Sequence, residues 1–138
     1  MVSLLIGSKG TGKTKRLLSR INAALEVTKG YVIVVEKDNL LTYNVNYRAR
    51  HVSTDYYNIS GYDGLFGLLS GLLAGNHDIT DVFIDATLRI GGRDFGLLSG
   101  FLSKINTLSE LSGASFTFTV STEEENIPDG VFDFCKKA

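Results

Sequence analysis

The 138-residue sequence contains one cysteine, one proline, one methionine and no tryptophan. A lone Cys135 cannot form an internal disulfide or a cysteine-rich zinc site, and it favours a reducing compartment. Charge of one sign is also lacking, because 14 Lys and Arg stand against 15 Asp and Glu. No chain-wide basic field therefore points to constitutive binding of nucleic acid.

Long apolar runs are missing as well. The most apolar stretch, residues 65–74, is interrupted by Gly67, Ser70 and Gly71, and it is shorter than the roughly 20 residues that span a bilayer. The apolar start, residues 2–6, is too short for a signal peptide and has no cleavage site. We therefore predict a soluble, cytoplasmic protein without a membrane partner.

The order of elements predicts an α/β fold. With 43% hydrophobic residues, the chain suits a single domain, residues 1–138, whereas two domains would each be too small to bury a core. Strands separated by helices favour a three-layer sandwich, with a mainly parallel sheet of about five strands and helices on both faces. Periodicity predicts strands at 2–6, 31–36, 49–54, 82–84 and 115–120, and helices at 13–27, 60–75 and 95–113. We expect irregular structure at 37–47 and a short helix or a loose tail at the C-terminus.

The most specific feature is a glycine-rich segment between the first strand and the first helix. Residues 7–14 fit the pattern G-x-x-x-x-G-K-[ST], the P-loop motif, in the strand-to-helix context that it requires. Glycines let successive N–H groups turn inward around phosphate oxygens, and the helix N-terminus adds its positive dipole end. The residues predicted to hold the phosphates are Gly7, Ser8, Lys9, Gly10, Thr11, Gly12, Lys13 and Thr14.

Within this loop the side chains have distinct expected roles. Lys13 brings a positive charge to the β- and γ-phosphates, which makes it a catalytic candidate, and Thr14 offers a hydroxyl to Mg²⁺. Lys9 is expected to be an exposed basic residue near the phosphates. The expected ligands are therefore ATP, or another nucleoside triphosphate, and Mg²⁺.

A magnesium site of this kind also needs a carboxylate. Such an acid usually follows an apolar strand beside the strand that leads into the P-loop. Asp85 follows the apolar residues 82–84 and is the predicted second metal residue. The alternative is an ordinary capping or loop aspartate.

Hydrolysis requires a group that orients or deprotonates water. Ala86, not an acid, follows Asp85, but Glu36 ends the strand after the first helix. In residues 7–14, Glu36 and Asp85 the chain resembles RecA-like P-loop ATPases, and more closely a set of small bacterial ATP-binding proteins. The resemblance implies the P-loop NTPase fold, with Glu36 as general base. The alternative is that Glu36 belongs to a solvated charge cluster.

Two further sets of residues are candidates for the same site. In RecA-like proteins a polar residue after the last predicted strand senses the γ-phosphate, a role open here to Ser121 or Thr122. Arg89 and Arg93 flank two glycines that predict a mobile loop, and arginine suits bidentate contact with phosphate. A flexible solvated loop is the alternative interpretation of that segment.

We therefore predict slow, magnesium-dependent ATP hydrolysis by a regulator or assembly partner, stimulated by a protein partner or by a second copy of the chain. A small-molecule or nucleotide kinase is an alternative, in which Arg89 and Arg93 belong to a lid. A module that binds nucleotide without hydrolysing it is another. The sequence does not distinguish ATP from GTP.

Overall fold

A computed structural model describes residues 1–41 and 44–138 of the chain. In these residues six strands form one sheet in the order β3-β2-β4-β5-β1-β6. The predicted irregular segment 37–47 includes residues 42 and 43, which lie outside the described residues. The strands are β1 (Val2–Ile6), β2 (Tyr31–Glu36), β3 (Arg50–Ser53), β4 (Ile79–Ile84), β5 (Ser115–Val120) and β6 (Cys135–Lys137).

Every described strand pair is parallel. The carboxyl ends of the strands therefore meet at one edge of the sheet, where α/β proteins commonly place their ligands. β5 pairs with β1 on one side and with β4 on the other. The expectation that the Asp85 strand lies beside the β1 strand is therefore wrong, since β5 occupies the position between them.

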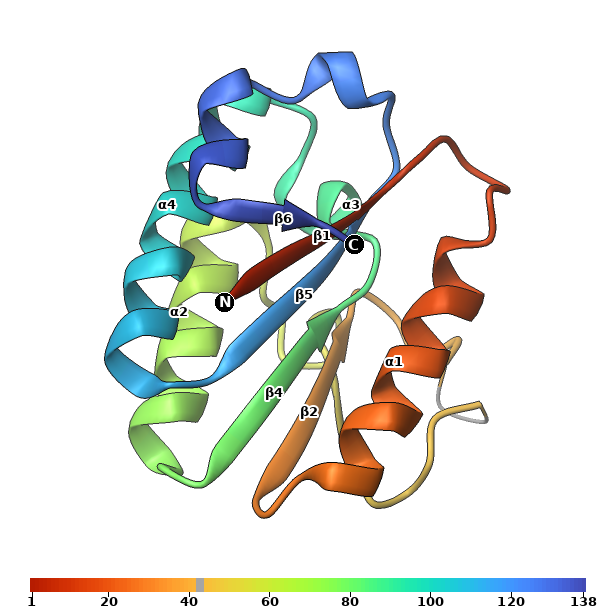
Figure 1. The fold of residues 1–138 in the computed structure, drawn as a ribbon, viewed down its shortest axis with the longest axis vertical. Coiled ribbons are helices and arrows are strands. Elements are labelled where there is room, and N and C mark those ends of the chain that lie inside the picture. The colour runs from red at the N-terminus through yellow and green to blue at the C-terminus, as the bar shows by residue number, and fades with distance from the viewer. Residues whose placement is uncertain (42–43) are drawn as a thin grey trace.

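Helices cover both faces of this sheet, as predicted for a three-layer arrangement (Figure 1). Helix α1 (Lys13–Val27) packs on one face through a stripe of buried residues, Leu17, Ile21 and Leu25. The opposite face is covered by α2 (Gly61–Gly75), the short α3 (Thr87–Gly91) and α4 (Phe95–Ser112). The strands between these layers are apolar on both faces because each face is buried.

The main differences from the predicted elements lie in the short ones. Residues 87–91 form the one-turn helix α3, and β4 begins at Ile79, before the predicted residue 82. The C-terminus is not a loose tail: it contains a short helix, one of the two expectations, and then a strand that was not predicted. A 3₁₀ helix, Asp129–Asp133, is followed by β6, where Cys135 pairs with Val2 and is buried. A three-residue strand has no periodicity of its own, and only its pairing with β1 defines it.

Among the residues that the structure describes, no helix has both the length and the apolar character needed to cross a membrane.

Candidate functional site

The loop between β1 and α1 has the backbone that its glycines allow. Gly10 and Gly12 have φ angles of 86° and 82°, in the left-handed region that other residues rarely adopt. At Gly7 a Cβ atom would lie 2.6 Å from the hydroxyl oxygen of Thr11. That hydroxyl donates to the Ser8 carbonyl at 2.8 Å. The loop therefore closes on itself, and this geometry depends on glycine at three of its positions.

The N-terminus of α1 is open to an external acceptor. Its residues, all of them described, include no acid in the first turn, and the N-cap Gly12 supplies no side-chain acceptor. Helix α4 is different, because its N-cap Asp94 accepts a hydrogen bond from the N–H of Leu97. The first N–H groups of α1 are therefore suited to an anion that approaches from the loop.

Lys13 is buried at the start of α1, and its ammonium group folds back onto the loop. Its Nζ donates to the Ser8 carbonyl at 2.8 Å and contacts the Thr11 hydroxyl at 3.4 Å. Burial lowers the pKa of Lys13, whereas the charge of Asp85 opposes this shift. The Lys13 ammonium is therefore held at the loop by exchangeable partners and lies within the electrostatic influence of Asp85.

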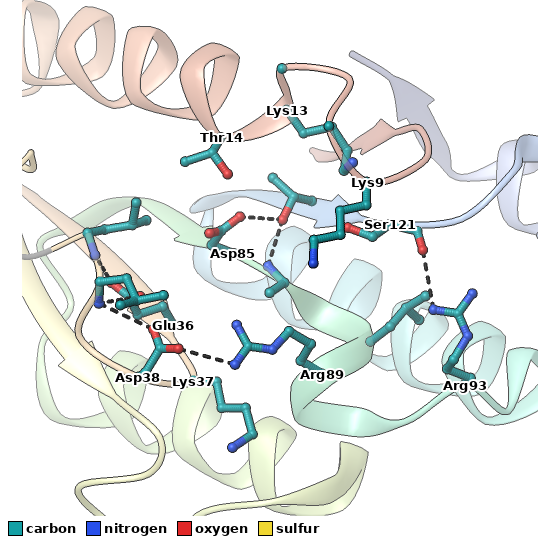
Figure 2. Close-up of a pocket in the computed structure, with 17 residues that line it drawn as sticks. Lys9, Lys13, Thr14, Glu36, Lys37, Asp38, Asp85, Arg89, Arg93 and Ser121 are labelled. Atoms are coloured by element: carbon teal, nitrogen blue, oxygen red, sulfur yellow. Dashed lines mark hydrogen bonds and ion pairs between the residues drawn. The ribbon is translucent and has the colours of Figure 1, made fainter.

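Asp85 follows β4 and is fixed at both its backbone and its side chain. Its N–H donates to the Val35 carbonyl of β2 at 2.9 Å. Its Oδ1 accepts a hydrogen bond from the Thr119 hydroxyl of β5 at 2.6 Å. Figure 2 shows the Asp85 carboxylate below Thr14, whose hydroxyl points towards it, and both residues line the same cavity.

Glu36 ends β2 with a buried carboxylate that already accepts three hydrogen bonds. Oε1 accepts the N–H of Leu40 at 3.1 Å, and Oε2 accepts the N–H of Leu41 at 2.9 Å and bonds to His51 Nε2 at 2.7 Å. Burial, followed by the neighbouring Asp38 carboxyl, raises the pKa of Glu36. The pKa of Asp38 is lowered, chiefly by its interaction with Glu36. Glu36 is therefore not part of a solvated charge cluster.

A cavity of about 760 Å³ brings most of the predicted residues together, a volume typical of small-ligand sites. Lys9, Gly10, Gly12, Lys13 and Thr14 line it. The other lining residues are Glu36, Lys37, Asp38, Leu40, Leu41, Asp85, Ala86, Leu88, Arg89, Arg93, Thr119 and Ser121.

Four of the predicted residues are not among those that line this cavity. Gly7 and Thr11 pack against each other within the loop. The Ser8 hydroxyl donates to Glu123 at 2.7 Å. Thr122 is buried and accepts a hydrogen bond from Asn126. Ser121 is therefore the residue after β5 that faces the cavity.

The two arginines lie on a different structure from the predicted mobile loop. Arg89 belongs to α3, and its guanidinium pairs with Asp38 at 3.2 Å. Arg93 follows α3 and donates to the Ser121 carbonyl at 3.3 Å. Gly91 packs closely against the ring of Tyr62, and the Tyr62 hydroxyl donates to the carbonyl of Gly92. The adjacent glycines thus serve a close packing contact, and both arginines line the cavity.

Thr119, Asp38 and His51 were not identified from the sequence. Thr119 lies in the alternating segment 115–120, where a threonine among buried strand residues is a usable signal. Asp38 reaches the cavity through the loop after β2, and His51 reaches Glu36 because β3 pairs with β2. No sequence pattern predicts the latter two contacts, since they depend on strand pairing and on the path of a loop.

The candidate magnesium ligands in the cavity are Thr14 and Asp85. Within residues 1–41 and 44–138, no group of three or more His, Cys, Asp or Glu side chains is placed to hold a metal ion. Mg²⁺ commonly binds through one or two protein oxygens together with substrate phosphates and water. The Thr14 hydroxyl and the Asp85 carboxylate are oxygen donors of that kind.

Neither the protein-family models nor the curated proteins that were compared with this chain match it.

Proposed function

We propose that this chain binds a nucleoside triphosphate together with Mg²⁺, as a P-loop protein of the RecA-like type. The observation that carries the proposal is the loop 7–12, whose left-handed glycines lead directly into the uncapped N-terminus of α1. Backbone N–H groups in that arrangement form an anion-binding concavity. The single domain and the P-loop NTPase fold are part of this proposal.

The charges around the cavity support a polyanionic ligand. Five cationic residues line it against three acidic ones, whereas the whole chain has a formal net charge of −1. The excess of positive charge is therefore local to the cavity. The cationic residues are Lys9, Lys13, Lys37, Arg89 and Arg93.

Each residue has a role that follows from its position. Lys13 exchanges its loop partners for the β- and γ-phosphates, and Thr14 and Asp85 hold the magnesium shell. Magnesium bound there would neutralise charge that develops on the phosphates. Arg89 and Arg93 reach the cavity from the side opposite the loop, where guanidinium groups suit phosphate oxygens.

For turnover we propose slow hydrolysis with Glu36 as the general base. Its raised pKa suits this role, because bases that work near neutral pH are tuned upward by burial. Oε2 bonds to both Leu41 N–H and His51, whereas Oε1 accepts the Leu40 N–H, so Oε1 is the oxygen proposed to contact water.

The engagement of Glu36 also favours a second candidate function. A carboxylate that holds the 37–41 loop through two N–H groups has a structural role that needs no chemistry. In that case the chain is a nucleotide-binding module that does not hydrolyse its ligand.

Calorimetric titration with ATP and GTP, each in magnesium and in EDTA, tests the binding proposal. We expect saturable binding of at least one triphosphate that magnesium strengthens. Absence of binding for both nucleotides would refute the proposal. Analysis of products at saturating ATP then separates the functions, because free phosphate indicates an ATPase, a phosphorylated acceptor indicates a kinase, and unchanged ATP indicates the non-hydrolysing module.

A further inference from the structure

Thr119 lies at the centre of the site but belongs to none of the motifs there. It is the fifth residue of β5, the strand between β1 and β4, and it is 1% exposed. In the sheet register it pairs with Leu5 of β1, two residues before the phosphate loop. On its other side, Phe118 pairs with Ile84, so Thr119 stands next to Asp85. One side chain therefore connects the strand of the loop with the strand of the acid.

The hydrogen bonds of Thr119 have only one possible direction. The N–H of Ala86 donates to Thr119 Oγ1 at 2.7 Å, so the hydroxyl oxygen is an acceptor there. The single hydroxyl proton is then donated to Asp85 Oδ1 at 2.6 Å. Donation to one oxygen of a carboxylate fixes the orientation of the carboxylate plane. Asp85 Oδ2 takes no part in either bond.

The same bonds hold a strained backbone position. Ala86 has a φ of 55°, in the left-handed region that is unfavourable for a residue with a Cβ atom. Strain of this kind persists where the surroundings determine it, and it is common at functional sites. Ala86 also caps α3, the helix that carries Arg89. Thr119 thus holds both the acid and the start of the arginine helix.

We propose that Thr119 is a positioning residue that orients Asp85, so that Oδ2 is left available to a magnesium ion bound with the nucleotide. This inference rests on the proposed function. Partners of this kind, which orient a metal-binding group without touching the metal, typically change metal affinity by about ten- to a hundredfold when they are removed. Thr119 is therefore expected to act on the magnesium dependence of binding and not on the contacts between loop and phosphates.

The test is a magnesium titration at saturating ATP, with ATP affinity in EDTA measured on the same proteins. Thr119→Val keeps the side-chain shape and removes the hydroxyl, whereas Thr119→Ser keeps the hydroxyl. Thr117→Val is the matched control, because Thr117 is buried on the same face of β5 but pairs with Phe83, away from the carboxyl edge. Asp85→Asn is the reference for loss of the carboxylate charge.

We expect Thr119→Val to raise the magnesium concentration at half-effect by about tenfold or more, while its ATP affinity in EDTA stays within about twofold of wild type. Thr119→Ser and Thr117→Val should behave as wild type. If Thr119→Val does not fold, Thr119→Cys replaces it, since a thiol is only a weak donor and acceptor.

The two possible failures differ in the wild-type protein. If wild type binds ATP with a magnesium effect and Thr119→Val has the same midpoint, the role of Thr119 is overturned and the proposed function stands. An equal shift in Thr117→Val would also overturn it, because the effect would then be general to β5. If wild type shows no magnesium effect, the proposed function and the inference fail together.

Discussion

Replacement of Lys13 by methionine isolates the charge at the phosphate loop. Methionine keeps a long unbranched stem, so the buried path of the side chain at the start of α1 stays filled. Only the ammonium group is lost. The Ser8 carbonyl and the Thr11 hydroxyl that it contacts belong to exposed residues and can bond to water instead.

The size of the effect follows from an exchange of partners. Near a protein surface, an ammonium about 4 Å from a unit phosphate charge gains roughly 4 kcal/mol. From this we subtract about 1 kcal/mol for the hydrogen bond to Ser8 that must break. The remaining 3 kcal/mol or so corresponds to roughly a hundredfold weaker binding. The free energy of unfolding should change by less than about 1 kcal/mol, since the lost loop contacts are offset by relief of the buried charge.

Calorimetric titration with magnesium ATP, beside urea unfolding of the same protein, measures both quantities. Lys9→Met is the matched control, because Lys9 makes the same substitution possible at an exposed position of the same loop, and it should weaken binding by less than about tenfold. Equal affinity of wild type and Lys13→Met would refute the reasoning. An unfolded Lys13→Met protein would contradict the stability estimate.

Three further predictions concern other parts of the molecule. Glu36→Gln should slow phosphate release about a hundred- to ten-thousandfold if Glu36 is the base. It should also lower the free energy of unfolding by about 1–3 kcal/mol, because the amide NH₂ faces N–H groups that need an acceptor. Unchanged turnover in a folded variant would assign the base elsewhere. Gly30→Ala should lower the free energy of unfolding in urea by about 1–3 kcal/mol or more, because its Cβ would clash with the carbonyl oxygen of Asp78. Gly67→Ala, on the exposed side of α2, meets nothing within 4 Å and should be neutral or stabilising. Similar losses of stability in both variants would contradict this prediction. Burial raises the pKa of the Cys135 thiol from 9.0 to about 12, so its contribution to stability is complete below pH 9 and is lost as the pH rises towards 12. Between these pH values the free energy of unfolding of Cys135→Ala should therefore fall less steeply than that of wild type, by up to about 1.4 kcal/mol per pH unit. Equal slopes would show that the thiol does not titrate differently on unfolding.

For Glu36, the sequence predicts its position at the end of a strand but not the hydrogen bonds of its carboxylate. Its place at the end of β2 was predicted from a run of β-branched residues that stops at an acid. Its three donors were not predicted, because two come from the path of the 37–41 loop and the third from His51 on a neighbouring strand.

The amino-acid sequence by itself determined the elements whose signals are local. Periodicity of apolar residues identifies α1, α2 and α4, and short buried runs identify β1, β2 and β5, because each pattern repeats within the element that it describes. The loop 7–14 also has a local signal, because glycines, a lysine and a threonine at fixed spacing predict its backbone conformation and its positive charge. Short elements such as α3 and β6 contain less than two repeats, so no apolar pattern can recur within them.

Only the tertiary structure decided which residues meet. The placement of β5 between β1 and β4 sets Thr119 beside Asp85 and brings Ser121 to the cavity while Thr122 stays buried. The pairing of Arg89 with Asp38 joins residues that are 51 positions apart. Strand order and loop path arise from the packing of whole faces against one another, and no local pattern in the chain encodes them.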